Sequence, residues 1–562
     1  MKSSALNFYS ITMFCLLLLC KTDYINAQLS VPDLQTKVDS ICASYNNSNS
    51  AGYAISVSYK GKTLLTKCYG LADMEHNVPV STNTVFEIAS LSKPITALAV
   101  ALLVQQNKIK INDEIIKFLP DLPECYKGIT IKHLLFHTSG IRDWVVAFRF
   151  SDRGSDQILM NDIASWIYRQ QELNFPYGEK YSYSNTNYNL LALVIEKVTN
   201  KPFPEWMKEN IFDPLQMKST HIHDDVSMIV TNRAESYANN NQGEIANLNG
   251  DNLVAYGSSS VFTTIEDLTK WANNYSNWTL GGQEVKEFMF QKGMNDKGEE
   301  TLYNCNGFSY DHWGVDCVRM SGGWAGYGSL WTYFPEHDLT LVSLSNHIAY
   351  DGKEMFQVAD LFLSNYYTRT KQENPLELSN LEKTETNTSI APLLTGNYEF
   401  LADPGTIVQI SYENDKLYAE IMGEEKFEIY SASDTVLFNK EMELVITYSA
   451  KFTSISWNQG GIWNAVRINE ITSKDLDKYQ GKYYSPELET TYKLDVADDM
   501  LYANHYKYGR YKLIPLGGNC FGNDAFYFEK VEFEFDKKNE VIGFRLSVGD
   551  LKNLLFMKQK MN

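Results

Sequence analysis

The sequence is poor in cysteine and in positive charge for its length. Its 562 residues include 8 cysteines, and 69 aspartates and glutamates outnumber 50 lysines and arginines, which gives a formal net charge of −19. This negative charge argues against nucleic acid or an anionic membrane surface as the main partner. The spacing of the cysteines fits neither a zinc site nor a haem attachment site. We therefore expect no nucleic-acid partner, no metal and no cofactor.

Closely spaced metal ligands are also scarce. The tetrapeptide His221-Ile222-His223-Asp224 is a short cluster of such side chains. It lacks further ligands at the spacing that metal motifs require. We interpret this stretch as a surface loop.

Long hydrophobic runs are limited to one, near the N-terminus. Residues 11–20 form an apolar core of ten residues, which is too short to span a bilayer. A basic residue precedes this core and the small residue Ala27 follows it, so the segment 1–27 is typical of a signal peptide. A lipoprotein signal that uses Cys20 is an alternative, which the bulky Leu19 disfavours. We expect an exported chain, periplasmic or extracellular, with no integral membrane segment after cleavage.

Six cysteines follow the predicted signal peptide. Export permits disulfides, and Cys305 and Cys317 are the only pair close enough in sequence to suggest a local bridge. The sequence indicates neither the remaining disulfide pattern nor an oligomeric state.

The composition, with 44% hydrophobic and 21% charged residues, is that of a globular protein, and the length predicts several domains. Strand patterns at both ends of residues 28–371 flank a helical middle. This order predicts an α+β domain in which an antiparallel sheet, built from both ends of the segment, carries helices on its faces. The expected strands are 52–59, 63–69, 330–334 and 339–345, and the expected helices are 29–45, the segment after residue 90, 131–136, 156–169 and 188–199.

The C-terminal part of the chain is repetitive. A polar stretch, residues 372–390, predicts a linker. Beyond it, Gly396-Asn397-Tyr398 is repeated as Gly481-Lys482-Tyr483 at an offset of 85 residues. The repeat predicts two small all-β barrel-like units, over 391–471 and 472–562. Their aromatic residues are typical of barrel cores, and a glycan- or peptide-binding role is the alternative.

The first candidate for chemistry is Ser90-Leu91-Ser92-Lys93, at the start of a predicted buried helix. Ser90 and Lys93 are three residues apart and therefore share one helix face. A serine becomes nucleophilic when a base takes its proton, which an amine sheltered from water can do at neutral pH. By itself the Ser-x-x-Lys pattern is expected by chance about twice in a chain of this length. An N-cap serine followed by a solvated lysine is the alternative interpretation.

A second candidate is the loop of tyrosine, serine and asparagine that precedes the helix 188–199. In it, Tyr183 is suited to proton transfer beside an ammonium group, and Asn185 is suited to hydrogen-bond a substrate amide or Lys93. The alternative is a polar loop with a core tyrosine.

A third candidate is Met320-Ser321-Gly322-Gly323, which leads into a predicted strand. Paired glycines on a strand edge allow close approach by a ligand or another backbone. The amide of Gly323 is then available to join the amide of Ser90 in an oxyanion hole. The alternative is an ordinary glycine-rich turn.

The three motifs, in this order, resemble the serine β-lactamase and penicillin-binding-protein superfamily. The likeness is greatest to the class C-type group of D-aminopeptidases, D-alanyl-D-alanine carboxypeptidases and esterases, and it covers roughly residues 35–365. It implies a β-lactamase/transpeptidase-like fold, and the two β units resemble the lipocalin-like barrels of some relatives. The catalytic residues that it implies are Ser90, Lys93 and Tyr183, and the substrate-binding residues are Asn185, Ser321, Gly322 and Gly323.

One residue departs from the family pattern. The third motif of the family usually opens with lysine or histidine, and here Met320 holds that place. Methionine carries no charge, which weakens the case for carboxypeptidase or strong β-lactamase activity and leaves esterase or aminopeptidase chemistry open. We interpret His137-Thr138-Ser139-Gly140 as a helix-ending turn with a structural role.

These observations together predict a secreted serine hydrolase that forms an acyl-enzyme. Its expected substrates are small-molecule or peptide amides and esters, including peptides with D-amino acids. The alternative is a penicillin-binding or other ligand-binding pseudoenzyme with little turnover, which Met320 favours and the four other motif residues oppose.

Overall fold

The computed structural model describes residues 31–46, 49–152, 157–240, 242–248, 253–368, 378, 381–385, 388–401, 406–421, 425–449, 451–459, 462–468, 476–522 and 528–560. The predicted signal peptide and most of the predicted linker lie outside these ranges. The chain forms two compact units. The first unit comprises residues up to 108, 199–293 and 302–369, and the second comprises 109–198, 294–301 and 370–562.

The first unit is built on a seven-stranded sheet in which all neighbours are antiparallel. Its strand order is β10-β11-β12-β13-β14-β1-β2. The strands are β1 (Tyr53–Tyr59), β2 (Lys62–Tyr69), β10 (Tyr303–Asn304), β11 (Gly307–His312), β12 (Val315–Trp324), β13 (Tyr327–Phe334) and β14 (Leu339–Ser345). Strands from both ends of the unit meet where β14 pairs with β1, which confirms the predicted antiparallel sheet.

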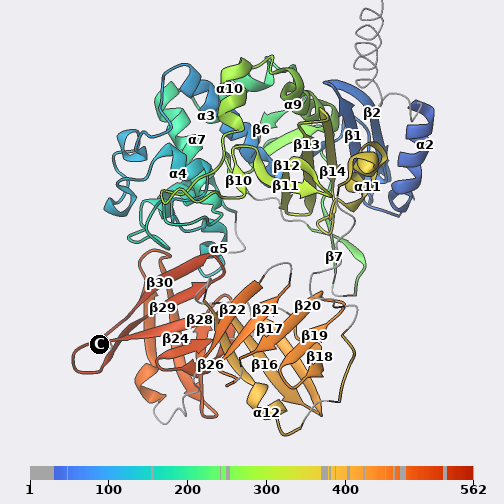
Figure 1. Ribbon diagram of the computed structural model, residues 1–562. Helices are drawn as coiled ribbons and strands as arrows, with labels where there is room; N and C mark the ends of the chain where they lie inside the picture. The colour runs from blue at the N-terminus through green and yellow to red at the C-terminus, as the bar shows by residue number, and fades with distance from the viewer. Residues whose placement is uncertain are drawn as a thin grey trace, which may run out of the picture. The chain divides into compact units, whose positions relative to one another are not determined.

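The helices of the first unit are α2 (Val31–Ile41), α3 (Ser92–Gln105), α8 (Phe203–Met207), α9 (Ile265–Asn277), α10 (Gly282–Met289) and α11 (Lys353–Leu363). Helices α2 and α11 lie on one face of the sheet, and α9 lies on the other (Figure 1). Leu330 of β13 packs in one core with Leu34 of α2 and Met355 of α11. The next residue, Trp331, points to the opposite face, and its ring centroid lies 4.9 Å from that of Trp271 of α9. This alternation is that of a strand buried on both faces.

The first unit also contains a small sheet with the strand order β5-β9-β6, and its strand β5 leads into the helix that carries Lys93. Its strands are β5 (Val85–Glu87), β9 (Val261–Thr264) and β6 (His221–Ile222). The interpretation of His221–Asp224 as a surface loop is wrong in part, because His221 pairs with Phe262 of β9 and His223 is 1% exposed. The ring of Phe262 covers the imidazole of His223, which explains the burial.

The second unit contains the helices from the middle of the chain. They are α4 (Ile131–Leu135), α5 (Trp144–Phe148), α6 (Met160–Ile167) and α7 (Asn185–Thr199). Thr130 caps α4: its hydroxyl accepts from the amide of His133, and the His133 ring accepts from the amide of Thr130. Helix α7 begins three residues earlier than the sequence predicts, so Asn185 is its first residue.

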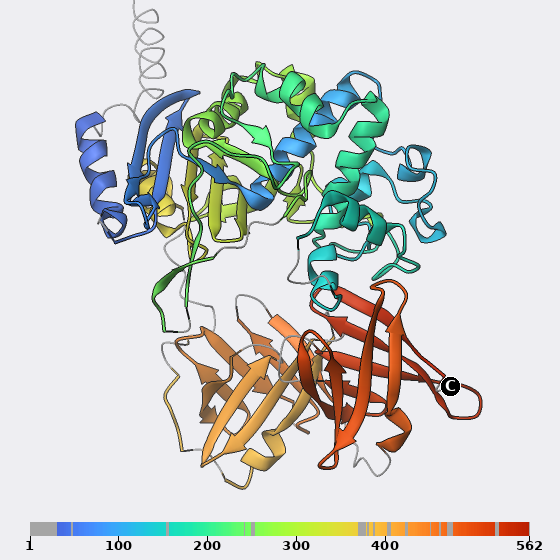
Figure 2. The ribbon, with the colours of Figure 1, turned by 180° about the vertical axis from the view of Figure 1, so that it is seen from behind.

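The second unit also contains two closed antiparallel barrels of eight strands each (Figure 2), which confirms the predicted pair of β units. The strands of the first barrel are β15 (Gly396–Phe400), β16 (Ile407–Glu413), β17 (Lys416–Ile421), β18 (Phe427–Ser433), β19 (Val436–Asn439), β20 (Leu444–Tyr448), β21 (Ser454–Asn458) and β22 (Ile462–Ile468). The strands of the second barrel are β23 (Gly481–Ser485), β24 (Thr490–Ala497), β25 (Met500–His505), β26 (Gly509–Gly517), β27 (Cys520–Gly522), β28 (Lys530–Phe535), β29 (Val541–Val548) and β30 (Leu551–Lys558).

The sequence repeat corresponds to a structural repeat. Gly396 and Gly481 open the first strand of each barrel with φ values of 147° and 149°. Two residues later, the hydroxyls of Tyr398 and Tyr483 each donate to the carbonyl four residues upstream. These buried tyrosines therefore bind the short helix that precedes each barrel, α12 (Ala391–Leu394) or η9 (Asp477–Tyr479), in the same way.

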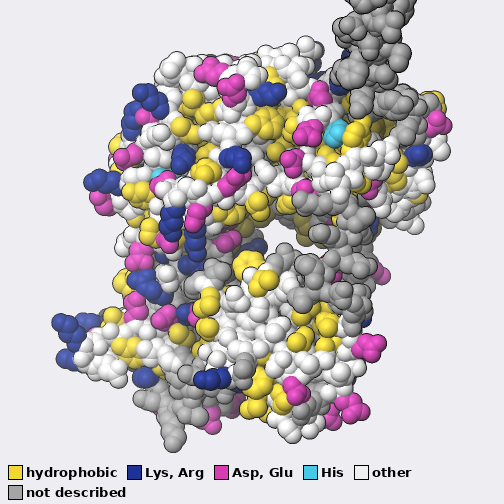
Figure 3. Space-filling view, viewed as in Figure 1, with side chains coloured by type: hydrophobic (Ala, Val, Ile, Leu, Met, Phe, Trp, Pro, Cys, Tyr) yellow, Lys and Arg dark blue, Asp and Glu magenta, His cyan; other side chains and the backbone are white. Residues whose placement is uncertain are grey.

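None of the helices in the described ranges is long and apolar enough to cross a membrane. On the face seen in Figure 3, acidic and basic side chains are interspersed over the described surface rather than gathered by sign.

The predicted bridge between Cys305 and Cys317 is wrong, because both thiols are free and buried, and burial raises the pKa of each to about 12. Cys317 packs in the core beneath α2 and α11, whereas Cys305 lies near Tyr275 of α9 on the other face.

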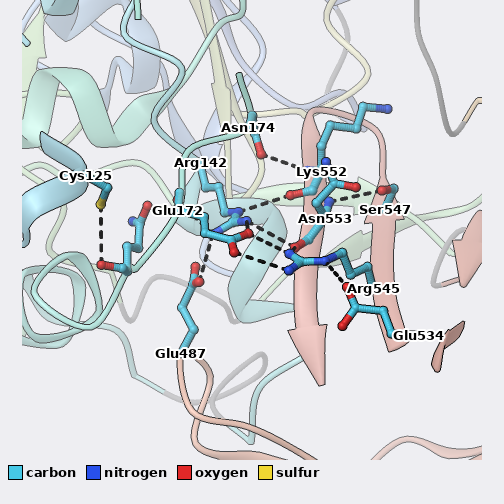
Figure 4. A network of polar contacts seen from close by, with 11 residues as sticks. Cys125, Arg142, Glu172, Asn174, Glu487, Glu534, Arg545, Ser547, Lys552 and Asn553 are labelled. Atoms are coloured by element: carbon cyan, nitrogen blue, oxygen red, sulfur yellow. Dashed lines mark hydrogen bonds and ion pairs between the residues drawn. The ribbon is translucent and has the colours of Figure 1, made fainter. Parts of the chain in front are cut away.

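A buried ion pair joins the second barrel to the helical part of the second unit (Figure 4). The guanidinium of Arg142, which precedes α5, donates to Glu487 in the turn between β23 and β24, with an N–O distance of 2.9 Å. Burial raises the pKa of Glu487 to about 7, although Arg142 and Arg169 act to lower it, and Glu172 adds to the rise. The carboxyl is thus a group whose protonation changes with folding.

Replacement of Glu487 by glutamine tests this pKa. A raised pKa in the folded state stabilises the protein below the unfolded value of 4.5, and this contribution is lost as the pH rises through about 7. Between about pH 5 and about pH 8, the wild type should therefore lose on the order of 2–3 kcal/mol relative to Glu487→Gln in chemical denaturation. The exposed neighbour Glu489, changed to glutamine, is the control and should show no such trend. A constant difference between wild type and Glu487→Gln would contradict the assignment.

Candidate active site

Ser90 lies in a tight turn between a short strand and a buried helix. Strand β5 ends at Glu87, a 3₁₀ turn η3 (Ala89–Leu91) follows, and α3 begins at Ser92. Ala89 has a φ of 45°, in the left-handed region that residues with a Cβ rarely adopt. This turn directs the chain abruptly from strand to helix, with Ser90 half-buried at the bend.

Lys93 is held at the hydroxyl of Ser90. Its side chain is in the first turn of α3, and the residue has 0% exposure. The Nζ atom lies 3.0 Å from Ser90 Oγ and 3.0 Å from the carbonyl oxygen of Ser258. A lysine nitrogen at this distance from a serine hydroxyl has the geometry that proton transfer between the two groups requires.

The loop before β9 supplies the carbonyl that binds Lys93, and no sequence motif indicated this loop. The hydroxyl of Ser259 donates to the buried carboxylate of Glu87 at 2.6 Å, and the amide of Ser260 donates to the same oxygen at 3.2 Å. Thr96 of α3 donates to the carbonyl of Gly257 at 2.8 Å. The loop is therefore fixed from both β5 and α3, and the Ser258 carbonyl is held in place for Lys93.

The glycine pair of the third motif lies in β12, where this strand approaches η3. Strand β11 pairs with β12 from Val315 to Arg319, so the pairing with β11 ends before Gly322 and Gly323. At Gly322, a Cβ atom would overlap the carbonyl oxygen of Ile88 and lie 2.9 Å from the amide nitrogen of Ser90. The Ser329 hydroxyl of the adjacent strand donates to that same carbonyl at 2.7 Å. Only glycine allows the two backbones to come this close.

Met320 and Ser321 lie on opposite faces of β12. Met320 is 2% exposed, and its side chain packs against Gly307 of β11, whereas Ser321 is exposed. Met320 shares its face with Gly322, on the side of the strand that approaches η3. The position that is cationic in the family pattern is thus filled here by a buried apolar side chain.

Tyr183 and Asn185 belong to the second unit, where their own neighbours hold them. The side-chain amide of Asn185 donates to Asp143 at 2.9 Å, and Asp143 also caps α5 by accepting from the amide of Val145. The ring of Tyr183 lies against that of His137, with centroids 4.5 Å apart and an interplanar angle of 32°. Asp143 was not identified from the sequence, which offers no pattern for it.

His137 is more than the helix-ending turn that the sequence predicts. It adopts a φ of 54° after α4, consistent with a turn. In addition, its Nδ1 accepts from the backbone amide of Ser184 at 3.2 Å and lies 3.0 Å from the side-chain nitrogen Nδ2 of Asn187. Nδ1 is therefore the acceptor, and a neutral ring carries its proton on Nε2. The imidazole supports the backbone between Tyr183 and Asn185.

The predicted site residues therefore fall into two groups. Ser90, Lys93 and Gly322 are close together in the first unit. Tyr183 and Asn185 are two residues apart in the second unit, and their cooperation with Ser90 stays a prediction. In the described part of the chain, no three His, Cys, Asp or Glu side chains are grouped so that they would hold a metal ion.

An antiparallel sheet flanked by helices, with a serine and a buried lysine at a helix start, is the architecture of β-lactamase-like proteins. A sequence profile of the family described as Beta-lactamase matches residues 38–357, which is more than half of the chain. The chain belongs to the Beta-lactamase family, whose members are typically serine hydrolases.

Individual relatives agree with this assignment. Penicillin-binding protein 4* of Bacillus subtilis (strain 168) is 29% identical over 436 residues, which cover 72% of this chain and 93% of that protein. The octameric penicillin-binding protein homologue from Pyrococcus abyssi aligns with a TM-score of 0.54 at 19% identity, over 78% of this chain and 100% of that one. D-amino acid amidase from Ochrobactrum anthropi SV3 aligns with a TM-score of 0.50 at 21% identity, over 59% of this chain and 98% of that one. These two structural likenesses establish the fold.

The close approach at Gly322 can be tested by adding one methyl group. Gly322→Ala should lower the free energy of unfolding by about 1–3 kcal/mol, because the new Cβ must push β12 away from η3. Gly323→Ala is the matched control, since its Cβ would meet only Ile348, 3.8 Å away. Thermal or chemical unfolding of both variants gives the comparison. Equal destabilisation by the two substitutions would contradict the close packing of β12 against Ser90.

Proposed function

We propose that this chain is an exported serine hydrolase that cleaves small amides or esters through an acyl-enzyme. The observation that carries the proposal is the hydrogen bond between buried Lys93 and Ser90, 3.0 Å long. The family match from residue 38 to residue 357 supports it, because this range includes all seven candidate site residues.

In the proposed acylation step, Ser90 Oγ attacks the substrate carbonyl carbon while its proton passes to the Lys93 amine. The amides of Ser90 and Gly323 stabilise the oxyanion of the tetrahedral intermediate. Asn185 orients the substrate, and Tyr183 relays the proton to the leaving amine or alcohol as the bond to the carbonyl carbon breaks. Ser321 and Gly322 border the substrate along β12.

In the proposed deacylation step, water attacks the acyl-enzyme carbonyl. Lys93 and Tyr183 take a proton from this water and return one to Ser90 Oγ as the acid product leaves. Each of these transfers is between groups already in the chain. The resulting cycle restores the hydrogen bond between Lys93 and Ser90.

Among the substrates of this class, we propose peptides that contain D-amino acids. The names of the similar proteins, a penicillin-binding protein and a D-amino acid amidase, support this choice. The buried Met320 supports amide or ester substrates that lack a free carboxylate at the position where the family has a cation.

Met320 also favours a second candidate function, a penicillin-binding protein with little turnover. A pseudoenzyme of this kind retains Ser90 and Lys93, becomes acylated and then releases the acyl group slowly. The two functions differ in the lifetime of the acyl-enzyme.

Acylation is tested directly by intact mass after incubation with a fluorophosphonate and, separately, with a penicillin. We expect one adduct per chain, absent in Ser90→Ala, because the activated hydroxyl is the only group that the mechanism makes nucleophilic. A penicillin adduct that is lost by hydrolysis during the incubation, with release of the hydrolysed penicillin, would support the hydrolase. An adduct that persists through the incubation would support the binding protein. An adduct that survives in Ser90→Ala would rule out the mechanism.

The role of position 320 is tested by Met320→His. Restoring a titratable group should raise turnover of a chromogenic ester by at least about tenfold, since general acid–base groups contribute on the order of 100-fold or more. Met320→Leu, which keeps a similar apolar volume, is the control and should leave turnover within about twofold. If the histidine variant folds normally and shows the same turnover as the leucine variant, position 320 takes no part in the reaction.

A further inference from the structure

A single arginine of the second unit is bound mainly by the second barrel (Figure 4). The side chain of Arg142 is 1% exposed. Its guanidinium donates to the Glu487 carboxylate at 2.9 Å, the Lys552 carbonyl at 3.1 Å and the Asn553 carbonyl at 3.2 Å, all in the second barrel. It also donates to the carbonyl of Glu172 at 2.9 Å. The barrel therefore supplies three of these four acceptors.

The backbone at Arg142 is in turn bonded to the segment that carries the second motif. The carbonyl of Arg142 accepts from the hydroxyl of Thr186 at 2.8 Å and from that of Ser184 at 3.3 Å. The next residue, Asp143, accepts from the side chain of Asn185 at 2.9 Å. The residues on both sides of Asn185 are thus bonded to Arg142 itself.

Further contacts bind the same barrel edge to the loop before Tyr183. Asn174 accepts from the amide of Lys552 at 2.8 Å and donates to the carbonyl of Asp550 at 2.5 Å. The ion pair of Arg545 with Glu172 adds a charged contact at 2.6 Å. Strand β30 and its neighbour β29 therefore contact this loop at several separate points.

We propose that Arg142 is a positioning residue for Tyr183 and Asn185, through which the second barrel fixes the second motif. The proposal rests on the proposed function in that Tyr183 and Asn185 are assigned to the reaction. Arg142 touches no reacting group itself: its side chain binds the barrel, and its carbonyl binds the motif.

The chemistry of the side chain explains why arginine is needed. Its planar guanidinium directs several N–H groups in fixed directions and remains charged when buried, so that it serves four separate acceptors at once. A lysine has one nitrogen and fills fewer of these positions. Lysine at 142 should leave buried carbonyls of β30 without a donor and loosen the turn before α5.

The first test measures how firmly the segment that carries Tyr183 and Asn185 is held, without relying on enzymatic activity. In Arg142→Lys, and in Glu487→Ala, which removes the acceptor of the Arg142 guanidinium, amide hydrogen exchange of residues 182–188 should become at least about tenfold faster. The exchange is measured by mass spectrometry on the full chain. Arg467→Ala is the matched control, because Arg467 donates to the Leu393 and Thr395 carbonyls within the first barrel. Its exchange over 182–188 should match the wild type. Unchanged exchange in both test variants would overturn the proposal.

The second test measures whether the effect passes through Tyr183. Arg142→Lys should slow acylation of Ser90 by a fluorophosphonate about tenfold to 100-fold, because a small misplacement of a catalytic group has an effect of that order. In a Tyr183→Phe background, the same substitution should slow acylation by less than about twofold. Equal slowing in the two backgrounds would show general destabilisation and overturn the proposal.

The two tests also separate this proposal from the proposed function. If the wild type forms no Ser90 adduct, the hydrolase proposal fails, and the exchange measurement still decides whether Arg142 holds the motif. If Arg142→Lys does not fold, Glu487→Ala, which leaves Arg142 in place and removes one of its acceptors in the barrel, provides both readouts.

Discussion

The burial of Lys93 is the constraint on which the geometry of the first unit depends. A buried lysine is tolerated when its amine finds acceptors, and here these are Ser90 Oγ and the Ser258 carbonyl. The acceptors come from two segments more than 160 residues apart in sequence. A displacement of either one leaves a buried polar group without its partner. The position of the Ser90 hydroxyl is therefore set by the folding of the whole unit rather than by its local turn.

Backbone conformation adds a second constraint at the same place. Ala89 is held in the left-handed region, and β12 approaches the carbonyl of Ile88 so closely that only glycine fits at 322. Both features cost conformational free energy, which the buried helix α3 and the central strands offset through packing. Strain that the surrounding structure maintains in this way is common where a reactive side chain must be presented at a fixed angle.

The sequence predicted the parts of this structure that have a period or a motif. Strand-like hydrophobic segments located the C-terminal part of β13 and all of β14, and the repeat of Gly396 and Gly481 located both barrels. The support for the site was not predictable in the same way. Asp143, Arg142 and the Ser258 carbonyl act on the motifs through contacts between segments distant in sequence, and single aspartates, arginines and carbonyls carry no local signal. The suggested bridge between Cys305 and Cys317 failed for a related reason, since proximity along the chain did not reveal that the two side chains face opposite sides of the sheet.

The duplicated barrels offer a comparison within one chain. The turn that carries Glu487 joins β23, which ends at Ser485, to β24, which begins at Thr490, whereas β15 ends at Phe400 and β16 begins at Ile407, so the two copies differ in length at this connection. Shared features, such as the hydrogen bonds of the Tyr398 and Tyr483 hydroxyls, fix the short helix before each barrel and are present in both copies. A carboxylate that is buried against an arginine of another segment costs desolvation free energy and contributes nothing to barrel closure. The Glu487 carboxyl therefore serves a contact outside the barrel, which is in line with the proposed support of the second motif by the second barrel.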